Sequence, residues 1–210
     1  MTNEIKWTHD GARVTLADYP GYVFDVTHDL DASDPVADSG APVEMYAARG
    51  GYRSTLGDNT GYWIDAHKRF EESFGDDAAD VLKRFAVAFH GWDKARADDA
   101  IHFGTYRGYS QSDWLDVLTV VTEDGYGMAE GWFEEWSQWA RGDVYTVGAE
   151  RFEECDCDCQ ATHTSREKDN GNELIYVGGI YADDVEEAAT YYAGEDRFSR
   201  AFSDRSTEYP

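Results

Sequence analysis

The sequence predicts an α+β fold, an antiparallel sheet with two or three helices packed on one face. Two β-rich runs near the N-terminus are joined by a tight turn, and a run rich in Val and Leu occupies 114–121. Apolar residues also recur with helical spacing at 77–90 and 130–141. Strands joined by short polar turns pair antiparallel, and helices with one apolar face cover such a sheet.

The first predicted unit of structure is a β-hairpin. Residues 12–17 (ARVTLA) and 22–28 (YVFDVTH) are the two strands, and residues 19–22 (YPGY) form a type II turn between them. Pro presets φ at the second position of that turn, and Gly accepts a positive φ at the third. Residues 29–44 contain Asp, Ser, Pro and Gly without periodicity, which predicts a long acidic loop.

The middle of the chain contains a predicted helix followed by two strands. The helix runs from about Asp77 to His90, because its apolar residues recur with helical spacing and Gly91 follows its end. Residues 100–106 and 114–121 are predicted strands on either side of a polar turn. The Val- and Leu-rich composition of the second strand is typical of a central strand.

A tryptophan-rich helix is predicted over 130–141, with Gly142 just past its end. We expect its tryptophans to lie in the core, because aromatic side chains dominate buried area. Residues 143–153 and 173–181 are predicted to be paired strands. Asp183 and Glu186 have the spacing of a capping box and predict a final helix.

The chain is long enough to bury a sizeable core without disulfide bonds. We expect one α+β domain over residues 1–193, with the acidic loop at 29–44 and a polar hairpin loop at 154–172. Residues 194–210 have no strong pattern and are predicted to be a weakly ordered tail.

Several short motifs of the second half resemble those of uncharacterised small acidic accessory proteins encoded in phage genomes. The motifs are Gly108-Tyr109-Ser110-Gln111, Trp139-Ala140-Arg141-Gly142-Asp143-Val144-Tyr145 and Gly179-Ile180-Tyr181-Ala182-Asp183-Asp184, with Leu56-Gly57-Asp58 upstream. Where many members have Cys-Trp before the last motif, this chain has Val177-Gly178. The resemblance implies a phage accessory protein in a host cytoplasm and carries no assigned reaction.

Net charge limits the classes of partner. With 43 Asp and Glu against 18 Lys and Arg, the formal charge is −25, so a basic surface that binds nucleic acid directly is excluded. We also expect no membrane association, because no apolar run approaches the length of a bilayer span and the N-terminus lacks the apolar stretch of a signal peptide. A cytoplasmic protein is predicted.

The acidic residues are unevenly distributed. Two windows contain no Lys or Arg, one between Arg13 and Arg49 and one between Arg107 and Arg141. Uncompensated carboxylates destabilise a compact state, and they also attract basic surfaces. We therefore expect a carboxylate-rich surface of this chain to bind a basic host protein of the nucleic-acid-binding class. Such binding includes DNA mimicry by an anti-defence protein. The candidate partner-binding residues are Asp113, Asp116, Glu123, Asp124, Glu130, Glu134 and Glu135.

A second candidate site is the cluster Cys155, Cys157, Cys159 and His163. Three thiolates and one imidazole are ligands that Zn²⁺ accepts in a structural tetrahedral site. The spacing differs from the common C-x2-C knuckle, so a reactive hairpin tip without metal is the alternative interpretation.

No catalytic motif is present. The Gly-rich stretch 49–61 lacks the signatures of a P-loop and of a dinucleotide fold, and Ser110 lacks the closing Gly of a nucleophile elbow. No catalytic residues and no cofactor other than the zinc just discussed are predicted. The alternative remains an enzyme or small-ligand-binding protein whose acidity is only a solvation adaptation.

Overall fold

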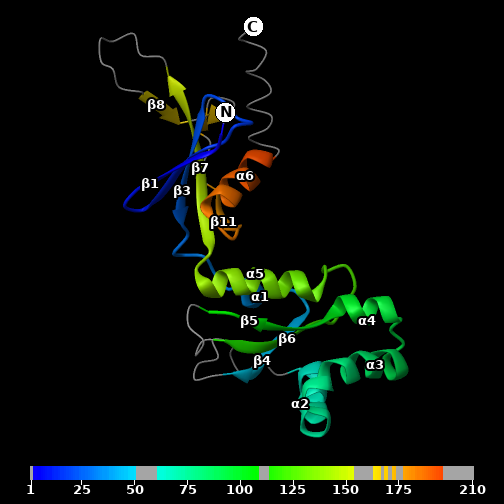
Figure 1. Cartoon of the computed structure of the whole chain (residues 1–210). Coiled ribbons are helices and arrows are strands. Elements are labelled where there is room, and N and C mark those ends of the chain that lie inside the picture. The colour runs from blue at the N-terminus through cyan, green and yellow to red at the C-terminus, as the bar shows by residue number, and fades with distance from the viewer. Residues whose placement is uncertain are drawn as a thin grey trace. The chain divides into compact units, whose positions relative to one another are not determined.

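A computed structural model describes residues 2–50, 61–108, 114–153, 163–166, 168–169, 172–173 and 177–195. The chain divides into two compact units: unit 1 comprises Met1–Ala32 and Gly142–Pro210, and unit 2 comprises Ser33–Arg141. Each unit has its own antiparallel sheet; within the described residues unit 1 has the helix α6 and unit 2 has the other helices (Figure 1), which confirms the α+β class. The sequence pattern treats residues 1–193 as one domain, whereas unit 2 is a continuous insertion between the two segments of unit 1.

Unit 1 is built on an antiparallel sheet of order β1-β2-β3-β7-β11, with β8 also paired to β7. Strands β9 and β10 form a separate two-stranded sheet, so the predicted polar loop at 154–172 contains short strands. The strands are β1 (Glu4–Trp7), β2 (Gly11–Thr15), β3 (Tyr22–His28), β7 (Val144–Glu153), β8 (His163–Arg166), β9 (Lys168–Asp169), β10 (Asn172–Glu173) and β11 (Val177–Tyr181).

The predicted hairpin is confirmed as β2 paired with β3. Gly21 has a φ of 89°, and the Tyr22 N–H donates to the Tyr19 carbonyl at 3.3 Å, as a tight turn requires. Ala12 and Val14 alternate with half-buried neighbours and lie in the core. The alternation therefore gives the sheet one apolar face.

Helix α6 (Val185–Gly194) covers the apolar face of the unit 1 sheet. Its Tyr192 is buried edge-on against Phe24, with ring centroids 6.2 Å apart. Asp184 caps this helix by accepting from the Glu186 and Glu187 N–H groups, each at 2.9 Å. The cap lies one residue later than the predicted Asp183. The helix begins at Val185, so the backbone N–H groups that need a side-chain acceptor are those of Glu186 and Glu187, which Asp184 reaches.

Unit 2 contains a three-stranded antiparallel sheet of order β4-β6-β5, with β6 in the centre as predicted. Its strands are β4 (Val43–Gly50), β5 (Ile101–Tyr106) and β6 (Leu115–Val121). Its helices are α1 (Pro35–Ser39), α2 (Tyr62–Phe74), the 3₁₀ turn η1 (Gly75–Asp77), α3 (Ala78–His90), α4 (Lys94–Ala100) and α5 (Ala129–Arg141).

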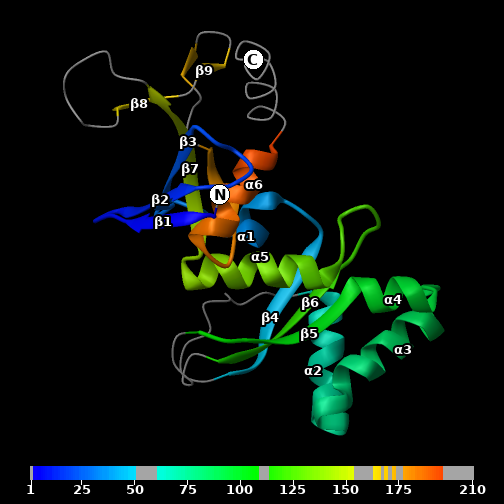
Figure 2. The same ribbon diagram turned by 45° about the horizontal axis from the view of Figure 1, so that its top comes forward.

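The unit 2 sheet has apolar side chains on both faces. Successive side chains of the central strand β6 point to opposite faces, and most of them are apolar and buried. Leu118 lies in one core with Ile64 of α2 and Leu82 of α3, whereas Val117 lies in a second core with Trp136 of α5. Figures 1 and 2 show the strands between α5 and the helices α2 and α3. Of the tryptophans expected in the core, Trp136 is fully buried, whereas Trp132 and Trp139 are only partly buried against the two cores.

The predicted acidic loop at 29–44 contains the short helix α1 and the start of β4. Asp34 caps α1 by accepting from the Val36 and Ala37 N–H groups at 2.9 and 3.1 Å. Pro35 occupies the first helical position, where its missing N–H costs nothing. This difference from the prediction arises because a single turn is too short to show periodicity.

Helix α2 is absent from the sequence prediction, and its cap comes from a distant residue. Gly61 at its N-terminus offers no side chain, and Glu44 of β4 accepts from the Trp63 and Ile64 N–H groups at 3.0 and 3.1 Å. A carboxylate at this end also interacts favourably with the helix dipole. None of the helices in the described ranges is long and apolar enough to cross a membrane.

Candidate acidic binding groove

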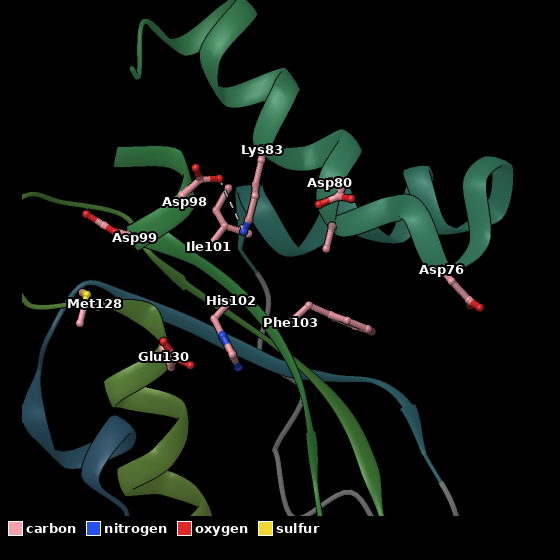
Figure 3. A pocket seen from close by; sticks show the side chains of 11 residues that line it. Asp76, Asp80, Lys83, Asp98, Asp99, Ile101, His102, Phe103, Met128 and Glu130 are labelled. Atoms are coloured by element: carbon pink, nitrogen blue, oxygen red, sulfur yellow. Dashed lines mark ion pairs between the residues drawn. The ribbon is translucent and has the colours of Figure 1, made fainter. Parts of the chain in front are cut away.

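An open groove with a volume of about 380 Å³ lies in unit 2 beside β5 (Figure 3). Five carboxylates and one lysine line it, together with an imidazole and apolar side chains. The lining residues are Asp76, Ala79, Asp80, Lys83, Asp98, Asp99, Ile101, His102, Phe103, Met128 and Glu130. We refer to this feature as the acidic groove.

Five elements of secondary structure supply the groove: η1, α3, α4, β5 and α5. Asp76, Asp80 and Lys83 follow one another at helical spacing along η1 and α3, so they lie along one side of that segment. Asp98 and Asp99 are at the end of α4, directly before β5, and Glu130 is in the first turn of α5. In Figure 3 Lys83 reaches toward Asp98 beside Ile101, with Glu130 on one side of β5 and Asp80 on the other, while Asp76 lies farther along and points away.

The lysines near the groove are concentrated on one carboxylate. Lys83 Nζ lies 3.9 Å from Asp98 Oδ1, and Lys94 donates to Asp98 Oδ2. The hydrogen bond from Lys94 lowers the pKa of Asp98. Asp80, Asp99 and Glu130 form no ion pair with any residue that the structure describes. The groove therefore retains an excess of negative charge at those three side chains.

His102 projects from β5 toward α5, where its ring lies 5.0 Å from that of Phe133. Burial lowers its pKa, although the nearby Glu130 and Glu134 act in the opposite direction. Because burial dominates, the imidazole is neutral at neutral pH and can donate one hydrogen bond and accept another. It adds no positive charge that would offset the carboxylates.

Apolar side chains complete the lining. Met128, just before α5, is 56% exposed. Phe103 of β5 is half-buried and stacks on the buried His67 with ring centroids 5.7 Å apart. Phe103 is thus fixed in position by the core, while Met128 offers a flexible apolar contact. The groove can accommodate a ligand that combines positive charge with an apolar stem.

Two of the predicted partner-binding residues belong to this region. Glu130 lines the groove, and Glu134 follows it by one helical turn on the exposed side of α5. Both carboxylates influence the pKa of His102, so both lie near β5. Glu135 points elsewhere on the same helix, and burial raises its pKa.

The remaining predicted residues of that window are not part of the groove. Asp116 is on the central strand and accepts from Thr105 Oγ1 at 2.9 Å. Glu123 and Asp124 are exposed in the turn after β6, and Asp124 pairs with Arg96 at 3.1 Å. Asp113 lies outside the described residues.

The first basic-free window is divided between the two units, because the boundary after Ala32 falls within it. Several of its carboxylates have structural partners. Asp29 accepts from the Gly179 N–H at 2.9 Å, while Asp34 and Glu44 cap helices as described above. These carboxylates offset unsatisfied backbone donors.

Asp76, Asp80, Asp98 and Asp99 were not among the predicted partner-binding residues. Each lies in a segment that also contains Lys or Arg, whereas the prediction relied on windows without basic residues. The spacing of Asp76, Asp80 and Lys83 on one helical side is a signal that the sequence contains. The sequence does not show that Asp98 and Asp99 of α4 lie beside this side of the helix. It also does not show that Lys83 and Lys94 both contact Asp98.

The predicted zinc site lies largely outside the described residues. Cys155, Cys157 and Cys159 are not described, and His163 begins β8, where it pairs with Glu153 of β7. Within the described ranges, no three His, Cys, Asp or Glu side chains lie close enough to hold a metal ion. The cysteine cluster therefore stays a prediction.

Comparisons with known proteins add no assignment. No protein-family model, curated protein sequence or solved structure matches this chain.

Proposed function

We propose that this chain is an accessory protein that binds a basic partner protein through the acidic groove of unit 2. The observation that carries the proposal is the concave arrangement of Asp80, Asp99 and Glu130, which form no ion pair within the described residues. Carboxylates gathered in a concave surface make the local electrostatic potential more negative, and this attracts cationic groups. Opposite charges at an interface mainly raise the association rate and set specificity.

The partner class that we favour is a nucleic-acid-binding protein. Such proteins present Lys and Arg side chains arranged to contact phosphates, and these side chains pair equally with carboxylates. The resemblance to phage-encoded accessory proteins supports a host protein in the cytoplasm as the target. Competition between this chain and DNA for the same partner would identify DNA mimicry.

The test measures binding of a purified basic DNA-binding protein to the full chain at increasing salt. The variant Asp80→Asn/Glu130→Gln removes two groove charges, and we expect it to weaken binding about five- to tenfold at low salt. The control Asp65→Asn/Glu72→Gln removes two exposed helix charges of unit 2 outside the groove. Equal affinities for the two variants, or binding that is insensitive to salt, would contradict the proposal.

A small cationic ligand is the second candidate. The groove volume of about 380 Å³ falls in the range of small-molecule sites, and its polar groups converge on one space. A polyamine combines positive charges with apolar stems and matches the carboxylates and Met128. Calorimetric titration with spermine tests this: saturable one-to-one binding that the groove variant abolishes favours the small ligand over the protein partner.

A further inference from the structure

The open edge of β5 lies along the acidic groove. Strand β5 pairs with β6 on one side, and within the described residues no strand pairs with its other side. Ile101, His102 and Phe103 line the groove, and the other lining residues belong to η1, α3, α4, α5 and the turn before α5 rather than to β6. The groove is therefore on the unpaired side of the strand.

An edge strand presents unpaired backbone groups to whatever occupies the space beside it. In an antiparallel strand, alternate residues direct both their N–H and C=O groups outward. These groups form a ready template for another extended segment, and the groove provides the space in which such a segment can lie (Figure 3).

The charges around the edge select the kind of strand that can be added. A second copy of this chain would bring more carboxylates to Asp80, Asp99 and Glu130 and would be repelled. A segment with Lys or Arg side chains would be attracted by the same three residues. Because side chains alternate along a strand, a bound segment would direct some toward Asp80 on α3 and others toward Glu130 on α5.

We infer that the acidic groove binds an extended basic peptide segment, which adds to the sheet of unit 2 as a fourth strand beside β5. The inference rests on the proposed function and specifies how the partner is held. Backbone hydrogen bonds along β5 supply affinity that does not depend on sequence, and the carboxylates select for basic side chains.

The test uses three labelled peptides of one sequence, in which Lys alternates with Thr. One peptide is unmodified, and the other two have N-methyl groups at alternate residues, along one strand edge or along the opposite edge. All three have the same charge. We expect one methylated peptide to bind about tenfold more weakly, the effect of about one or two lost hydrogen bonds, while the other binds nearly as well as the parent.

Hydrogen exchange gives a second measurement. The unmodified peptide should slow the exchange of amides in Ile101–Tyr106, and Asp65→Asn/Glu72→Gln should leave this protection in place. Equal affinity of the two methylated peptides, or unchanged exchange in β5, would overturn strand addition. If the three peptides still bind with salt-sensitive affinity that Asp80→Asn/Glu130→Gln reduces, the proposed function stands without it. If none of them binds, both proposals fail.

Discussion

The substitution Glu44→Ala should destabilise unit 2 by about 2 kcal/mol, because Glu44 is the cap of α2. Its carboxylate accepts from two N–H groups, those of Trp63 at 3.0 Å and Ile64 at 3.1 Å. Loss of a capping side chain costs about 0.5–2 kcal/mol. Loss of a negative charge near a helix N-terminus adds about 0.3–1 kcal/mol. The substitution Glu44→Gln keeps an acceptor but loses the charge, so it should cost about 0.5–1 kcal/mol.

Urea unfolding followed by tryptophan fluorescence suits this measurement. All but one of the seven tryptophans lie in unit 2, so the signal reports mainly on that unit. The midpoint should fall with little change in slope, since the surface exposed on unfolding is the same. An unchanged midpoint for Glu44→Ala would show that water replaces the carboxylate without loss, and the capping argument would be wrong.

Gly61→Ala provides an independent check of the same contact. A Cβ at Gly61 would overlap the carboxyl group of Glu44, while the φ of −163° is extended and adds no backbone strain. The substitution should therefore displace the cap in the wild-type background and cost little once Glu44 is already alanine. We expect a coupling of about 1–2 kcal/mol in the double-mutant cycle, and additive losses would refute the overlap.

Three further outcomes are expected. Trp136→Ala should cost about 3–5 kcal/mol in urea unfolding, because Trp136 is fully buried and packs edge-on against Tyr106 at 5.3 Å. His102 has a pKa below its unfolded value, so unit 2 should lose stability as the pH falls through the unfolded pKa of about 6.5, and thermal melts of His102→Gln should show a shallower dependence. Burial raises the pKa of Glu135 above its unfolded value, so its charged form opposes folding at neutral pH. Glu135→Gln should therefore raise the melting temperature at pH 7. The wild type should gain stability as the pH falls toward the pKa of Glu135, and the variant should lack this gain.

Elements with short-range signals were predictable from the sequence. The 19–22 turn between β2 and β3 needs only Pro and Gly at adjacent positions, and α3 and α5 each end at a glycine with positive φ. The central position of β6 followed from its high Val and Leu content. These signals are contained within a few residues of the chain.

Elements that depend on distant residues were not predictable in this way. Helix α2 begins at a glycine, and its cap arrives from β4, so no local signature marks its start. The division into two units also depends on long-range pairing, since β3 of the first segment of unit 1 pairs with β7 of the second. The first boundary lies within the Asp-, Ser-, Pro- and Gly-containing stretch 29–44, whereas the second, after Arg141, has no Pro-, Gly- or Ser-rich composition.

The candidate site was only partly predictable because neighbours in sequence do not determine which charges meet. Glu130 and Glu134 are among the predicted partner-binding residues, and both are exposed on α5 and lie near His102. The other carboxylates of the groove include those of α3 and α4. These segments also contain lysines, so their local net charge in the sequence is less negative than that of the basic-free windows. Only the folded arrangement shows that two lysines converge on Asp98.

The insertion of unit 2 has a consequence for the order of events on the ribosome. Strands β1, β2 and β3 emerge first, but the neighbour that β3 requires begins only at Val144, after the whole of unit 2 has been synthesised. Unit 2 is continuous in sequence and can therefore fold before β7 is synthesised. During that time the edge of β3 that later pairs with β7 has no neighbouring strand. Nascent chains are most exposed to intermolecular pairing during that interval, and a chaperone that covers β3 would act before residue 144 appears.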